Sequence, residues 1–106
     1  MNYRFMRIIV MFDLPMNSLE DQRNYTEFRK CLISNGFLML QKSVYCKMSI
    51  NLSKADSVIQ AIRKSIPRKG LIQILVITEK QFSSMQTYVG KMNPSIIDGD
   101  QGVIII

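Results

Sequence analysis

The chain has 106 residues, the size of one ordinary domain, and 47% of them are apolar, which excludes a disordered chain. Its 14 Lys and Arg residues outnumber 8 Asp and Glu, so the net charge of +6 favours a polyanionic partner, although simple solubility explains it equally well. Histidine is absent, which excludes every histidine-based catalytic triad and leaves carboxylate, metal-activated water or lysine for any hydrolysis.

The two cysteines, Cys31 and Cys46, are not part of a CxxC pair, and the chain is not a cysteine-dense secreted scaffold. No secretory signal is visible, and no apolar stretch is long enough to cross a bilayer. We therefore expect a cytoplasmic protein with reduced, packed thiols and no membrane partner.

Residues 4–13 form the first predicted strand, because the run from Ile8 to Phe12 is apolar on both faces, as in a central buried strand. Asp13 ends this run. Pro15 follows in the next loop and stops strand pairing, because proline donates no backbone hydrogen bond.

Residues 18–35 form the first predicted helix. Ser18 and Asp21 have the spacing of a capping box at its start, and Gly36 provides a stop at its end. Three apolar residues recur on one face at helical spacing. They are Tyr25, Phe28 and Leu32.

Residues 37–41 and 43–50 form two further predicted strands, and the second alternates cleanly. One of its faces is apolar and consists of Val44, Cys46, Met48 and Ile50. The second helix is predicted over 53–66, opened by a capping box from Ser53 to Asp56 and ended by Pro67.

Residues 71–77 read as another interior strand, and residues 78–85 as a short helix capped by Thr78 with Gln81. Turn formers dominate residues 90–102. The chain ends in four large aliphatic residues, each worth about 1.5–3 kcal/mol when buried, so we expect a tail strand that forms a dimer. These residues are Val103, Ile104, Ile105 and Ile106.

The element order predicts an α+β fold of the ferredoxin-like βαββαβ type, with an extra C-terminal strand that pairs across a homodimer. A single domain is expected over residues 1–106, with a core at 1–85 and the tail at 86–106. The fold alone does not decide the function, because it hosts many.

Asp13 is the main candidate for a catalytic and metal-binding residue. It lies at the rim of the sheet, and its oxygens suit Mg²⁺ or Mn²⁺. One carboxylate makes a poor site, whereas two copies of Asp13 facing each other across a two-fold axis would share an ion. The alternative is that Asp13 caps the following loop, and spacing alone favours this alternative.

Eight basic residues are candidates for nucleic-acid contact, and their scatter suits phosphate binding rather than base reading. They are Arg23, Arg29, Lys30, Lys42, Arg63, Lys64, Arg68 and Lys69. A solvated surface remains an equal alternative, and cations near 63–69 also stabilise a helix C-terminus. Tyr45 could stack on a base or be a half-buried sheet residue, and the second reading is favoured.

Several segments in order along the chain resemble the Cas2 family of small CRISPR-associated adaptation proteins, with a likeness to its type II-A branch. These segments are Arg7–Pro15 (RIIVMFDLP), Tyr25–Lys30, Gly36–Phe37, Gln41–Tyr45, Lys69–Leu71 and Thr78–Phe82. The resemblance implies a ferredoxin-like homodimer in which tail strands complete the partner's sheet. It also implies a role in spacer acquisition, with the dimer placed between two dimers of a larger integrase subunit, in a heterohexameric complex that holds double-stranded DNA.

The resemblance further implies a Mg²⁺-dependent endonuclease acting on RNA or DNA, with Asp13 as the metal aspartate and Phe12 as the aromatic residue before it. Some nuclease-active relatives carry an arginine where this chain has Met39 and Leu40. The alternative is therefore a purely structural DNA-binding adaptor without nuclease activity. A regulatory domain for a small ligand is the third reading, and no motif supports it.

Overall fold

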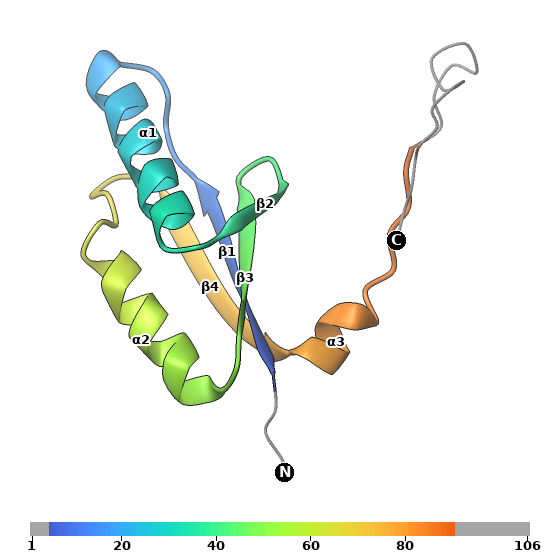
Figure 1. Cartoon of the computed structure of the whole chain (residues 1–106). Coiled ribbons are helices and arrows are strands. Elements are labelled where there is room, and N and C mark those ends of the chain that lie inside the picture. Colours follow the sequence, from blue (N-terminus) through green and yellow to red (C-terminus); the bar gives the residue numbers. More distant parts are fainter. Residues whose placement is uncertain (1–4, 91–106) are drawn as a thin grey trace.

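The computed structural model describes residues 5–90, which form a four-stranded sheet and three helices (Figure 1). In chain order the elements are β1 (Met6–Asp13), α1 (Leu19–Ser34), β2 (Leu38–Gln41), β3 (Val44–Ser49), α2 (Leu52–Arg63), β4 (Leu71–Thr78) and α3 (Glu79–Ser83). The predicted tail strand at 103–106 lies outside the described residues.

The sheet has the strand order β2-β3-β1-β4, and every neighbouring pair is antiparallel. Because β3 lies between β1 and β2, the first strand–helix–strand unit is split, as in ferredoxin-like folds. Strand β1 pairs with the edge strand β4 along its whole length, from Met6 opposite Thr78 to Asp13 opposite Leu71. The predicted α+β, ferredoxin-like fold is confirmed for this part of the chain.

The core lies between one face of the sheet and the two long helices, which cover the same side (Figure 1). Successive residues of a strand point to opposite faces, and β1 sends its alternate apolar side chains towards the helices. The core cluster combines residues from β1, α1, β3 and α2. Its most buried members are Ile8, Val10, Phe28, Leu32, Phe37, Tyr45, Ala55 and Ile62.

Tyr45 lies on the helix side of β3 and is only 2% exposed, so it is a core residue and not a half-buried one. It stacks on Phe12, with ring centroids 5.8 Å apart, and its hydroxyl accepts a hydrogen bond from Arg29 at 2.9 Å. Tyr45 therefore cannot stack on a nucleic-acid base. The apolar alternate positions of β3, from Val44 to Met48, lie on the opposite face of the sheet.

Two of the three predicted helix caps are confirmed. Ser18 and Asp21 form a reciprocal capping box on α1, and Thr78 and Gln81 form one on α3. The predicted cap at Ser53 is wrong, because the Asn51 side chain accepts the hydrogen bond from the Lys54 amide at 2.8 Å. The helix therefore starts earlier than predicted and ends at Arg63, before the predicted end at residue 66.

Helix α3 lies at one end of the face opposite the long helices, where Arg7 holds it. The Arg7 guanidinium binds the Glu79 carboxylate through two hydrogen bonds, of 2.9 and 2.7 Å, and lies 4.2 Å from the centre of the Phe82 ring. The hydrogen bonds to Glu79 raise the pKa of Arg7 above its usual value, so the ion pair keeps its cation. No helix within residues 5–90 is long and apolar enough to span a membrane.

Candidate metal site and nucleic-acid interface

Asp13 is the last residue of β1 and is exposed. It lies on the face of the sheet opposite the long helices, because Phe12 and Val10 of the same strand point into the core. A shallow hollow of about 260 Å³ opens beside it. The hollow is lined by Met11, Phe12, Asp13, Lys42, Ser43, Val44, Leu71 and Gln73.

The β2–β3 turn is bound to this end of the sheet. The Phe12 amide donates to the Ser43 carbonyl at 3.1 Å, which ties the β2–β3 turn to the end of β1. Ser43 has a φ of 62°, a left-handed conformation that is uncommon for residues other than glycine. This turn places the neighbouring Lys42 in the same hollow as Asp13.

The hollow combines oxygen ligands with a cation. The Asp13 carboxylate, the Ser43 hydroxyl and the Gln73 amide carry oxygens that Mg²⁺ accepts as ligands, so the residues present fit a hard divalent ion. Within residues 5–90, no three His, Cys, Asp or Glu side chains gather as a metal cluster. Asp13 is the one carboxylate among the residues that line this hollow.

Gln73 was not identified from the sequence as a residue of this site. It lies on β4 opposite Met11, on the same face as Asp13, among the aliphatic residues Leu71 and Leu75. The signal that could have found it is this alternation, in which an amide interrupts an otherwise aliphatic side of a strand.

The face of the sheet that carries Asp13 is apolar and open, and we call it the open face. Four large side chains on it are exposed by about half or more. They are Leu38 at 73%, Met48 at 49%, Leu71 at 55% and Leu75 at 49%. An exposed apolar surface of this kind is typical of sites that contact another protein, a membrane or a ligand. Asp13 lies at one end of it.

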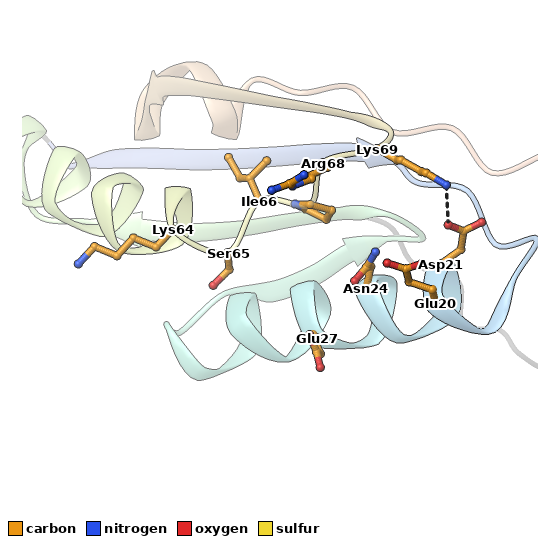
Figure 2. A pocket seen from close by; sticks show the side chains of 10 residues that line it. Glu20, Asp21, Asn24, Glu27, Lys64, Ser65, Ile66, Arg68 and Lys69 are labelled. Atoms are coloured by element: carbon orange, nitrogen blue, oxygen red, sulfur yellow. Dashed lines mark ion pairs between the residues drawn. The ribbon is translucent and has the colours of Figure 1, made fainter.

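Three of the predicted phosphate-binding residues line a cleft of about 540 Å³ between α1 and the loop before β4 (Figure 2). They are Lys64, Arg68 and Lys69. The opposite wall of this cleft is acidic and carries Glu20, Asp21 and Glu27. The exposed Lys69 ammonium lies 3.9 Å from the nearly buried Asp21 carboxylate, so its charge is partly offset within the chain. The charges of the two walls balance, which does not favour a polyanion.

The other predicted cations are dispersed. Arg29 is tied to the buried Tyr45 through its Nε atom, whereas Lys42 lies in the hollow beside Asp13. Arg23, Lys30 and Arg63 are exposed on the helices. Lys42 is thus the predicted cation that shares a hollow with the candidate metal site.

The structure defines a class, that of small ferredoxin-like α+β domains with an open apolar sheet face and a carboxylate at its end. The family model described as "CRISPR associated protein Cas2" matches residues 6–85. Two similar proteins are both named "CRISPR-associated endoribonuclease Cas2". The protein of Treponema denticola is 42% identical over 95% of this chain and 100% of its own length, and that of Streptococcus mutans is 40% identical over 95% and 93%.

A solved structure named "Crystal structure of cas2" has a TM-score of 0.58 to this chain, at 16% sequence identity, and the similarity covers 95% of this chain and 99% of the other. At that identity it supports the fold alone. The family match and the two relatives decide the family: this chain belongs to the Cas2 family of CRISPR-associated proteins.

Proposed function

We propose that two copies of this chain pack through their open faces and cleave phosphodiester bonds of RNA or DNA at paired Asp13 residues. One observation carries the proposal: Asp13 lies at the end of an exposed apolar sheet face and shares its hollow with Lys42 and Gln73. The two relatives named as endoribonucleases support RNA as a substrate.

In this proposal three polar side chains of the hollow have one role each. The Asp13 carboxylates of the two copies hold a shared Mg²⁺ or Mn²⁺ ion, which supplies activation of water and charge neutralisation at phosphorus. Lys42 attracts the phosphate as a point charge, and the Gln73 amide donates to a phosphate or ribose oxygen. Because the chain has no histidine, any general base in this reaction is a different group.

Asp13→Asn tests the assignment, because it keeps the shape of the side chain and removes the charge. We expect cleavage of labelled single-stranded RNA and DNA in Mg²⁺ or Mn²⁺ to fall more than about 100-fold, since changing a group that merely orients a metal ligand already costs about 10–100-fold. Product formation is measured on a denaturing gel. A parallel reaction with added chelator tests whether cleavage needs the metal ion.

Asp56→Asn is the matched control, because Asp56 is an exposed carboxylate on α2, outside the hollow. This variant should cleave as the unmodified protein does. Cleavage by Asp13→Asn at the unmodified rate, or cleavage that resists chelator, would refute the metal-dependent mechanism.

A second candidate is a non-cleaving adaptor for CRISPR adaptation. In this role the dimer would bridge two dimers of the larger integrase subunit and bind the backbone of double-stranded DNA. The observation that favours it is that Met39 and Leu40 of β2 are 61% and 39% exposed and apolar, where nuclease-active relatives are expected to carry an arginine. Integration of a labelled duplex with the larger subunit should then survive Asp13→Asn, and loss of integration would exclude a purely structural role.

A further inference from the structure

Gly70 lies against the backbone that carries Asp13. It precedes β4, and the first residue of β4, Leu71, pairs with Asp13 in the last rung of the sheet. A Cβ atom on Gly70 would lie 2.8 Å from the Asp13 carbonyl oxygen, 2.6 Å from Leu14 Cδ2 and 3.1 Å from Leu14 Cα. Two of these three atoms belong to the backbone, so no side-chain rotation would relieve the contact.

The conformation of Gly70 adds a second requirement. Its φ of +95° lies in the region that side-chain-bearing L residues rarely adopt. The Leu14 side chain that it touches is buried, at 8% exposure, and cannot move outwards without opening the core. Any side chain at position 70 would therefore push the Asp13–Leu14 segment itself.

We propose that Gly70 is a positioning residue for the Asp13 carboxylate. Its missing side chain lets the end of β1 lie against the start of β4, and this close approach sets where Asp13 leaves the sheet and enters the hollow. The inference rests on the proposed function of Asp13 and adds to it the residue that orients the carboxylate.

The chain contains two matched controls. Gly36 also has a positive φ, of +91°, but the three atoms nearest to a Cβ there all belong to the Lys47 side chain, with Nζ at 2.6 Å, and this flexible tip can move away. It lies in the turn between α1 and β2, outside the hollow. A Cβ on Gly90 would meet nothing within 4 Å. Gly36→Ala thus carries the backbone strain without the contact to Asp13.

The experiment compares Gly70→Ala, Gly36→Ala, Gly90→Ala and the unmodified full chain. Mn²⁺ alone is the probe, and its binding is followed by electron paramagnetic resonance, beside thermal unfolding and the amide resonances of Asp13 and Leu14 without metal. We expect both positive-φ variants to unfold at lower temperature. Only Gly70→Ala should bind Mn²⁺ about 10–100-fold more weakly and shift the two amide resonances. Gly90→Ala should change none of these readouts.

Unchanged Mn²⁺ binding together with unchanged Asp13 and Leu14 resonances in Gly70→Ala would overturn the inference. So would equal effects on Mn²⁺ binding in Gly70→Ala and Gly36→Ala. If the unmodified protein neither binds Mn²⁺ nor cleaves, the proposed function fails, and the metal-free resonances alone decide whether Gly70 positions Asp13.

A second substitution covers the case in which Gly70→Ala does not fold. Asparagine accepts a positive φ better than alanine does but still carries a Cβ atom. Gly70→Asn therefore keeps the contact to the Asp13 backbone with less strain. It should show the same displaced Asp13 resonance and weaker Mn²⁺ binding, and unmodified values in this variant would refute the inference.

Discussion

Lys42 and Lys69 look alike in the sequence but have different surroundings. Lys42 lies in the hollow with Asp13, but within residues 5–90 no ion pair joins Lys42 to a carboxylate. Lys69 faces Asp21 at 3.9 Å across a cleft whose two walls balance in charge. Because a phosphate gains little from a cation that a carboxylate already neutralises, we expect the two lysines to contribute differently to nucleic-acid binding.

A pair of neutral substitutions distinguishes them. Lys42→Gln should weaken binding to double-stranded DNA and reduce the slope of log affinity against log salt by about 0.9 for each phosphate that the lysine no longer neutralises. Lys69→Gln should leave both the affinity and the slope near those of the unmodified protein. The measurement is a filter-binding titration over a range of salt concentrations.

The opposite order, with Lys69→Gln changing the slope and Lys42→Gln not, would place the phosphate-binding residues in the cleft between α1 and the loop before β4. An affinity that does not depend on salt would refute phosphate binding by any of these cations.

At the scale of elements, local hydrogen bonding made α1 and α3 predictable. In each case a hydroxyl residue and an acceptor three positions later form a reciprocal box that the spacing alone indicates. The start of α2 was mispredicted because Asn51 and Ser53 are both good caps. The choice between them follows from the end of β3, where the Ser49 hydroxyl binds the Asn51 carbonyl at 2.9 Å.

The cap assignment of α2 predicts an asymmetric effect of two alanine substitutions. Asn51→Ala removes the acceptor of the Lys54 amide and should lower the free energy of unfolding by about 1 kcal/mol. Ser53→Ala changes an exposed residue inside the helix and should stay within about 0.5 kcal/mol. Denaturant unfolding at one fixed protein concentration measures both, and equal losses would contradict the cap at Asn51.

At the scale of the whole molecule, the open face explains why β3 is apolar on the side that faces away from the helices. The alternation of β3 correctly predicts two different faces. The face towards the helices holds the buried Tyr45 and Ser49, whereas Met48 on the other face is exposed. Burying the exposed half of a leucine or methionine is worth about 1 kcal/mol, so a surface with several of them favours association. We expect two copies of this chain to associate through this face.

Leu75→Glu tests that expectation. Leu75 is 49% exposed on the open face, and burying a charge there in both copies would cost more free energy than removing the leucine alone. The dimer should weaken by more than about tenfold, as measured by light scattering over a dilution series.

Leu19→Glu is the control, because Leu19 is 78% exposed at the start of α1, away from the open face. It should leave the oligomeric state unchanged. A Leu75→Glu protein with the unmodified dimer affinity would show that the open face is not the interface, and the shared ion site would have to be abandoned with it.

The alternation of the strands, the stripe of α1 and the spacing of two caps are local properties, so the amino-acid order alone was enough to predict the elements and the ferredoxin-like arrangement. The place of Asp13 at the exposed end of the first strand was predictable for the same reason, since it ends an apolar run. Its surroundings were not, because Lys42, Gln73 and Gly70 come from separate segments that only sheet register brings beside it. Tertiary packing also decided which cations are compensated, because Asp21 and Lys69 meet across a cleft between elements far apart in the chain.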